Sequence, residues 1–258
     1  MNPNRIETYI EGLNKTLQDK LFFLNVFQKD YFKNKIIIDF GCGDGSVLEY
    51  ISRHCDITDS ILIGVDINDS ILEYAKQKNI KDCVFVNSLA ELDWSKKTKD
   101  IIIIATSVLH ELGYVTQKTL FKFVAEHASC FIVRDMCFTY PKQGLDVYDY
   151  KDIHAKIIRN SNSKLLTSFV EKYGLVPEIN IAHYLMKYTY VENWDTELEE
   201  DYTSVDWLRL ERIPTFEISY DRTFIQEWRR NQVMKDFDID IEKLTQSTHR
   251  ELIMVRQK

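Results

Sequence analysis

The sequence predicts an α/β fold with a doubly wound, mostly parallel sheet, an N-terminal helix and a helical cap inserted after the fifth strand. Five short apolar runs rich in Ile and Val alternate with segments whose apolar residues recur every three or four positions. Such continuous apolar runs are typical of parallel strands buried on both faces. A glycine-rich turn follows the first run. The expected strands cover residues 36–40, 61–65, 83–86, 100–105 and 130–133.

The helices between these strands are predicted from the period of their apolar residues. Before the first strand, apolar residues from Ile6 to Leu24 recur at helical spacing, which predicts a helix that covers the sheet. Further helices are expected after the glycine-rich turn, at 70–75 and at Thr116–Ala128. This alternation of strands and helices predicts a single parallel sheet.

The pattern changes after the fifth strand. More helical segments are predicted there than a single connection needs, at about 150–159, 164–173, 180–190 and 203–211. A helix over 223–235 follows, and two strands at 237–241 and 251–255 are expected to close the fold as a hairpin. The expected organisation is an N-terminal helical segment, an α/β core, a cap and a closing segment, at residues 1–33, 34–140, 141–214 and 215–258.

Composition narrows the class of protein. With 258 residues and 45% hydrophobic content, the chain can bury a substantial core. A net charge of −7 is not typical of a non-specific nucleic-acid binder. The five cysteines form neither a CxxC pair nor a zinc set, so free thiols and no metal site are expected. No apolar run approaches the ~18 residues that span a bilayer, which predicts a cytoplasmic protein without a membrane partner.

The glycine-rich turn is the most informative stretch. Three of the eight glycines, Gly41, Gly43 and Gly45, fall within five positions after the first strand. This spacing indicates positive φ angles or a backbone that a ligand approaches closely. A dinucleotide-binding turn would have a third glycine where Ser46 stands, and a phosphate-binding Walker loop would have a Lys-Ser/Thr pair after its last glycine. Neither pattern fits.

The stretch from Asp39 to Gly45 resembles the first motif of the class I S-adenosylmethionine-dependent methyltransferases, in which an acid is followed by three alternating glycines. The resemblance covers roughly residues 34–135. It implies a Rossmann-like sheet and S-adenosylmethionine as cofactor. The glycines and the small Cys42 would lie against the methionine part of the ligand, and Asp39 would orient its ammonium group or the turn itself.

Polar residues at the ends of the next two strands extend the resemblance. Ligands of doubly wound sheets bind beyond the carboxyl ends of the strands, so Asp66 faces the same crevice as the glycine turn. It can accept both ribose hydroxyls, with Ile67 on the adenine face. Asn68 and Asp69 are available to cap the next helix, which leaves Asp66 for the ligand. Family members commonly carry an aspartate after the third strand. This chain has Asn87 and Ser88 there, and Ser88 also fits a capping box.

The segment after the fourth strand is expected to lie beside the reacting sulfonium. Thr106 and Ser107 are candidate cofactor contacts, and His110 is the candidate general base. Glu111 or Asp135 could orient its ring. Alternatively, His110 and Glu111 only cap a helical turn. Arg134 and Asp135 could pair with each other in a structural role, or Arg134 could hold an anionic group of the acceptor while Asp135 faces the nucleophile.

The resulting hypothesis is a methyltransferase that acts on an oxygen or nitrogen of a small or nucleoside-like acceptor. The cap supports it with aromatic and acidic residues suited to a planar or cationic group: Tyr184, Tyr188, Tyr190, Glu192, Trp194, Asp195, Glu199, Tyr202 and Trp207. One alternative is an RNA methyltransferase that uses the basic stretch from Arg222 to Lys235, although a solvated helix face is the default interpretation. A non-catalytic cofactor-binding protein and a nicotinamide-dependent oxidoreductase also remain open.

Overall fold

The computed structural model describes residues 3–96, 98–139, 147–160 and 205–257, together with Leu166, Thr167, Val170, Glu171, Tyr184, Leu185 and Tyr188. Within the chain, two compact units can be distinguished. The first comprises residues 1–135, 202–222 and 251–258, and the second comprises residues 136–201 and 223–250.

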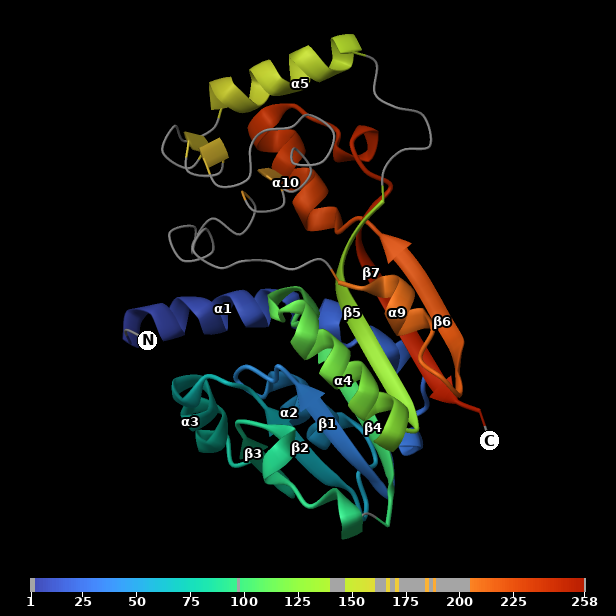
Figure 1. Cartoon of the computed structure of the whole chain (residues 1–258). Coiled ribbons are helices and arrows are strands. Elements are labelled where there is room, and N and C mark those ends of the chain that lie inside the picture. Colours follow the sequence, from blue (N-terminus) through green and yellow to red (C-terminus); the bar gives the residue numbers. More distant parts are fainter. Residues whose placement is uncertain are drawn as a thin grey trace. The chain divides into compact units, whose positions relative to one another are not determined.

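A seven-stranded sheet with the order β3-β2-β1-β4-β5-β7-β6 is the framework of the fold (Figure 1). The strands are β1 (Lys35–Phe40), β2 (Ile61–Val65), β3 (Cys83–Val86), β4 (Asp100–Thr106), β5 (Cys130–Thr139), β6 (Phe216–Phe224) and β7 (Ser247–Arg256). The pairs among β1 to β5 are parallel. The mostly parallel sheet predicted from the sequence is confirmed.

The strand β7 runs antiparallel to both of its neighbours. Near its end, the Arg256 N–H donates to the Ser129 carbonyl, while near its start the Ser247 hydroxyl donates to the Cys137 carbonyl. On its other side, the Ser219 hydroxyl of β6 donates to the Ile253 carbonyl. The three strands β5, β6 and β7 each contribute residues to both units.

Alternate residues of the central strands enter two hydrophobic cores. Ile36, Ile38, Ile101 and Ile103 pack with the inner face of α4 (Tyr114–His127). Their neighbours in sequence face the opposite side, where Ile37, Ile102 and Ile104 pack with α2 (Ser46–His54) and with the aromatic residues Phe22, Phe23 and Phe32. Because side chains alternate along a strand, these apolar runs bury both faces of the sheet.

The other helices of the first unit are α1 (Pro3–Lys20), α3 (Asp69–Gln77) and α9 (Trp207–Glu211). In the second unit, α5 (Val147–Asn160) and α10 (Glu227–Phe237) share a separate core that includes Ile157, Val233 and Phe237. The helix predicted at 150–159 is therefore confirmed. The predictions at 164–173 and 180–190, and the cap residues Tyr190, Glu192, Trp194, Asp195, Glu199 and Tyr202, lie mostly or wholly outside the described residues.

Two sequence predictions for the closing segment are wrong. No strand forms at 237–241, because α10 extends to Phe237 and the chain then turns through Asp238 in the left-handed region at φ 55°. The partner of the last strand is instead β6, which was not predicted although Phe216, Ile218 and Tyr220 alternate with polar residues. The fifth strand also continues past residue 133, to Thr139.

Packing between β2 and β3 gives a test of the core. A Cβ atom at Gly64 would lie 2.4 Å from Cδ1 of Phe85 and 2.9 Å from the Cys42 Sγ. We expect Gly64→Ala to lower the free energy of unfolding by about 1–3 kcal/mol through overpacking. The matched control is Gly12→Ala in α1, where nothing lies within 4 Å of the added Cβ and helix propensity favours alanine. Urea titrations of the two variants check this, and equal stabilities would contradict it.

Candidate functional site

The glycine loop after β1 has a backbone that only glycine adopts readily. Gly41, Gly43 and Gly45 have φ angles of 73°, 51° and 75°. A Cβ at Gly41 would also lie 2.3 Å from Cγ2 of Val108, so the loop packs tightly against the segment that follows β4. The positive φ angles predicted from the glycine spacing are therefore present.

Asp39 lies in β1 immediately before this loop and is almost fully buried, with 1% of its surface exposed. Its Oδ2 atom accepts no hydrogen bond from the described residues. Burial raises the pKa of this carboxyl to about 7; Lys20 opposes the shift, while Asp66 and Asp44 add to it. A buried carboxylate oxygen with unused acceptor capacity can receive a cationic group of a ligand.

Asp66 follows β2 and holds the glycine loop in place. Its Oδ2 accepts a hydrogen bond of 3.0 Å from the Gly43 N–H, and its Oδ1 accepts one of 3.0 Å from the Asn68 N–H. Asn68 caps α3, as predicted, by accepting from the N–H groups of Ser70 and Ile71. The adjacent Ile67 side chain is 90% exposed and so is available to pack against a ligand. Contacts of Asp66 and Ile67 with a cofactor stay predictions.

Asn87 and Ser88 follow β3 and are engaged locally. The Asn87 side-chain amide donates to Asp69 Oδ1 at 2.6 Å. Ser88 forms the predicted capping box with Glu91 at the start of a short 3-10 helix. Asn87 therefore lies beside Asp66, as expected from the parallel strands, and donates to its backbone carbonyl at 3.4 Å. A role for Asn87 or Ser88 in reading the adenine stays a prediction.

His110, shortly after the carboxyl end of β4, comes together with Asp135 of β5. Asp135 is fully buried, and its Oδ1 lies 2.6 Å from the His110 Nδ1. Its Oδ2 accepts from the N–H groups of Val108 at 3.1 Å and Leu109 at 2.7 Å. This arrangement favours the tautomer in which His110 donates from Nδ1 and keeps Nε2 as a proton acceptor. Glu111 Oε1 is 3.8 Å from that Nε2.

Arg134 and Asp135 lie inside β5 rather than after it, because the strand extends to Thr139. As neighbours in a strand, their side chains point to opposite faces of the sheet. Arg134 donates to the Ser107 hydroxyl at 3.0 Å and lies 3.3 Å from Asp19 Oδ2 of α1. Ser107, directly after the buried Thr106, adopts a left-handed conformation with φ 59° and donates its N–H to the Arg134 carbonyl. Strained backbone of this kind is typical of functional sites.

Lys20, at the end of α1, was not among the predicted site residues. Only 8% of its surface is exposed, and burial lowers the pKa of its amine. A signal was present in the sequence, because Lys20 is three residues after Leu17 and four before Leu24, on the apolar stripe of the helix. A lysine in an apolar stripe indicates either a buried partner or a ligand.

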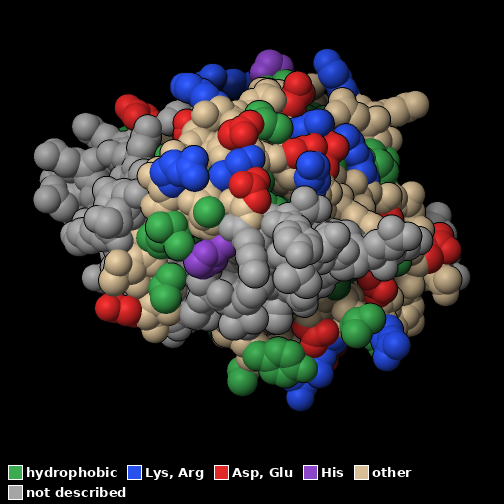
Figure 2. Space-filling view, turned by 90° about the horizontal axis from the view of Figure 1, so that it is seen from above, with side chains coloured by type: hydrophobic (Ala, Val, Ile, Leu, Met, Phe, Trp, Pro, Cys, Tyr) green, Lys and Arg blue, Asp and Glu red, His purple; other side chains and the backbone are tan. Residues whose placement is uncertain are grey.

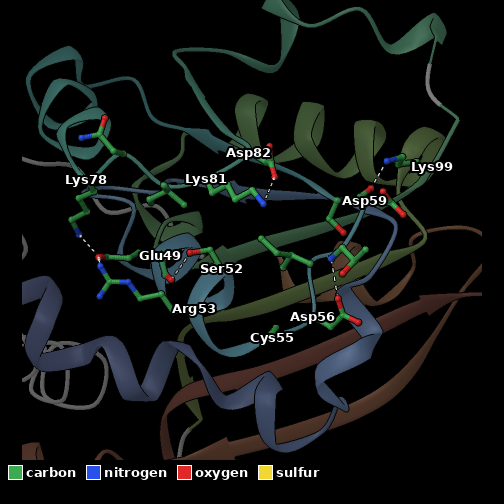
Figure 3. A pocket seen from close by; sticks show the side chains of 15 residues that line it. Glu49, Ser52, Arg53, Cys55, Asp56, Asp59, Lys78, Lys81, Asp82 and Lys99 are labelled. Carbon is green, nitrogen blue, oxygen red and sulfur yellow. Dashed lines mark hydrogen bonds and ion pairs between the residues drawn. The ribbon is translucent and has the colours of Figure 1, made fainter.

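A pocket of about 850 Å³ lies elsewhere in the first unit (Figure 3). It is lined by the segments before β2 and β3, whereas the glycine loop follows the carboxyl end of β1. Its charged residues pair with one another: Glu49 Oε1 lies 2.7 Å from an Arg53 guanidinium nitrogen, and Glu49 Oε2 lies 3.3 Å from Lys78 Nζ. This pocket is therefore distinct from the crevice at the carboxyl ends of the strands.

The basic stretch from Arg222 to Lys235 does not form one solvated face. Arg229 is fully buried and its guanidinium lies 4.5 Å from the centre of the Trp228 ring, while Arg230 pairs with Glu242 at 2.7 Å. The interpretation of the whole stretch as a solvated helix face is therefore wrong for Arg229. Figure 2 shows Lys and Arg side chains interspersed with Asp and Glu among the described residues of one face.

The described residues contain no group of three or more His, Cys, Asp or Glu side chains placed to hold a metal ion. Within the same ranges, no helix is long and apolar enough to cross a membrane. Cys42, in the glycine loop, is buried, and burial raises the pKa of its thiol well above the usual range. Its small size, rather than its reactivity, accounts for it in the loop.

Comparison with known proteins finds similarity over part of the chain. Residues 37–130 match the family described as a methyltransferase domain. A segment of 44 residues is 43% identical to a protein of Invertebrate iridescent virus 6 named as a methyltransferase, 235L. That segment covers 17% of this chain and 16% of the viral protein.

Solved structures show the same fold. The plantazolicin methyltransferase BamL is similar with a TM-score of 0.53 and 11% identity, over 100% of this chain and 92% of that one. PKMT2 from Rickettsia typhi is similar with a TM-score of 0.50 and 14% identity, over 87% of this chain and 48% of that one. This chain therefore spans about half the length of the Rickettsia protein.

The hydrogen bonds of Asp135 lead to a prediction about stability. In Asp135→Asn, an amide with one acceptor oxygen replaces a carboxylate that accepts from three nitrogens, so at least one buried donor loses its partner. We expect the free energy of unfolding to fall by about 2–4 kcal/mol. Glu111→Gln, at a side chain that is 46% exposed, should change it by less than about 0.5 kcal/mol. Guanidinium titrations decide, and an unchanged Asp135→Asn protein would refute the structural role.

Proposed function

We propose that the chain is a class I S-adenosylmethionine-dependent methyltransferase that transfers a methyl group from this cofactor to an oxygen or nitrogen nucleophile of a small or nucleoside-like acceptor. The match of residues 37–130 to a methyltransferase domain supports this proposal. The observation that carries the proposal is the His110–Asp135 pair at the carboxyl edge of the sheet that also bears the glycine loop. A general base and a cofactor loop at one edge can serve one reaction.

The residues at this edge fit the cofactor. The unused Oδ2 of Asp39 can accept from the ammonium group of its methionine part. The glycines keep the loop free of side chains, and a Cβ at Gly43 would already meet Leu13 of α1 at 2.9 Å. The exposed Ile67 offers apolar surface to the adenine ring, and Asp66 retains lone pairs for ribose hydroxyls. Cys42, Asn87, Ser88, Thr106 and Ser107 complete the proposed cofactor contacts.

Bound S-adenosylmethionine supplies an electrophilic methyl group on a sulfonium centre. An acceptor hydroxyl would give its proton to His110 Nε2 as its oxygen bonds to the methyl carbon, while the bond from that carbon to sulfur breaks and S-adenosylhomocysteine leaves. An acceptor that is a protonated amine would lose its proton to His110 first, because only the neutral amine has a lone pair to form the bond. Asp135 fixes the ring through Nδ1 and stabilises the imidazolium that forms. Glu111, near Nε2, provides a second negative charge for the same imidazolium. Arg134 would hold an anionic group of the acceptor or order Ser107 beside it.

A small acceptor is favoured over RNA for two reasons. The net charge is −7, and Lys and Arg are interspersed with Asp and Glu on the face shown in Figure 2. Phosphates require a broad basic surface, which neither feature favours. The stretch offered for RNA contains Arg229, which is buried. In addition, BamL, which shares the fold, was solved with a triazolic desmethylPZN analog and SAH, which supports a small-molecule acceptor. The proposed location is the cytoplasm, and the substrate region is proposed at residues 141–214.

The raised pKa of Asp39 predicts how cofactor affinity depends on pH. Below about pH 7 the carboxyl is protonated and neutral, so it loses its attraction for the ligand ammonium. We expect the affinity for S-adenosylmethionine to fall as pH drops from 8 to 5.5, by up to about tenfold per unit below that pKa. Calorimetry at four pH values measures it. In Asp39→Asn the profile should be weak and flat, and a flat wild-type profile would remove Asp39 from the site.

The role of His110 is tested by separating binding from turnover. His110→Ala should lower methyl transfer roughly 10²- to 10⁴-fold while the dissociation constant of S-adenosylmethionine changes little, because the base acts on the acceptor. His54→Ala, which removes an exposed histidine in the last turn of α2, is the matched control and should retain most activity. Full activity of His110→Ala would exclude it as the base. Cofactor binding without transfer by the wild-type protein would favour the non-catalytic alternative.

The acceptor class can be found with labelled cofactor. The protein is incubated with methyl-labelled S-adenosylmethionine and a host extract separated into small-molecule, RNA and protein fractions. We expect label in the small-molecule fraction that is lost with His110→Ala. Label in the RNA fraction would overturn the small-acceptor proposal. A melting shift with NAD, and none with S-adenosylmethionine, would instead favour an oxidoreductase.

A further inference from the structure

Lys20 is a buried cation whose neighbours surround the proposed cofactor crevice. It is on the last turn of α1, and 8% of its surface is exposed. Among the described residues, no hydrogen bond or ion pair within 4.0 Å is formed by its amine. A buried ammonium without a partner is destabilising, so its presence needs an explanation.

The charges that act on Lys20 come from four different elements of the crevice. In decreasing order of their effect on the pKa of Lys20, they are Asp39 near the end of β1, Arg134 in β5, Glu111 after β4 and Asp44 in the glycine loop. The end of α1 lies at this crevice, because Asp19, the residue before Lys20, is 3.3 Å from the Arg134 guanidinium of β5. Arg134 donates to Ser107 and lies near Asp19, whereas the Lys20 amine has no such partner among the described residues.

Lys20 and Asp39 form a pair of opposite charges that are near each other but not in contact. Each is more than nine-tenths buried, and Asp39 Oδ2 accepts no hydrogen bond from the described residues. A ligand that carries a carboxylate and an ammonium on one carbon would satisfy both groups at once. Such a zwitterion is the amino-acid end of S-adenosylmethionine.

We propose that Lys20 binds the carboxylate of the cofactor's amino-acid end, while Asp39 binds its ammonium, so that α1 is part of the cofactor site. This inference rests on the proposed cofactor. It assigns to Lys20 a positioning role, because the residue fixes the amino-acid end and does not contact the transferred methyl group. The packing of Leu13 of α1 near Gly43 shows that the same helix also covers the glycine loop.

The experiment compares three ligands on Lys20→Met by calorimetry at pH 8. The ligands are S-adenosylmethionine, its decarboxylated form, which keeps the amine, and 5′-methylthioadenosine, which lacks the amino-acid end. We expect affinity for S-adenosylmethionine to fall roughly 10- to 100-fold, the range for a lost charge-assisted hydrogen bond. Affinity for the other two ligands should change by less than about threefold, because neither presents a carboxylate.

Two controls keep the outcome interpretable. Lys118→Met removes an exposed lysine of α4 and should leave all three affinities unchanged. Lys20→Arg keeps the charge and should retain most of the affinity for S-adenosylmethionine, which also covers the case in which the methionine variant does not fold. An equal loss for all three ligands, or no loss for any, would overturn the inference. Failure of the wild-type protein to bind S-adenosylmethionine would instead overturn the proposed function.

Discussion

Burial of the central strands on both faces is the constraint on which the site depends. Because β1 and β4 are apolar on either side, ionisable side chains can stand only where the strands leave the sheet. At that edge Asp39, Arg134 and Asp135 are nonetheless buried, so each must find a partner inside the protein. Asp135 finds three donors, and Arg134 finds Ser107 and Asp19. Asp39 keeps an oxygen without one.

This difference distinguishes buried side chains that stabilise the fold from buried side chains that are available to bind a ligand. A carboxylate with three donors fixes the backbone after β4 and contributes to stability. A carboxylate with an unused oxygen, beside a buried amine, costs stability until a complementary ligand is bound. Proteins retain such costs mainly at functional sites, where local consistency gives way to binding. The burial of Asp39 and Lys20 therefore supports the proposed binding of a charged ligand without recourse to any resemblance.

Much of the fold followed from the sequence because short-range rules determine it. The apolar runs predicted the parallel strands, the glycine spacing predicted the turn, and Asn68 and Asp69 were the candidate caps of α3, of which Asn68 is the cap. The site was less predictable. Lys20 and Asp39 are far apart in the chain, and Arg229 is basic yet buried, because tertiary packing decides both. The strand β6 was not predicted, although its apolar and polar residues alternate, because the segments on either side of it have helical patterns.

The register of β5 explains how its neighbouring residues Arg134 and Asp135 take part in different contacts on opposite faces of the sheet. Thr106 pairs with Arg134, and the chain turns at once through the left-handed Ser107, so that the next two N–H groups reach Asp135. Since neighbours in a strand face opposite sides, Arg134 is directed to α1 and Asp135 to His110. A slip of one residue would exchange the two charges and leave both without partners. The bond from the Ser107 N–H to the Arg134 carbonyl, with the left-handed turn, thus fixes which face carries the proposed base and which carries the cations beside the cofactor.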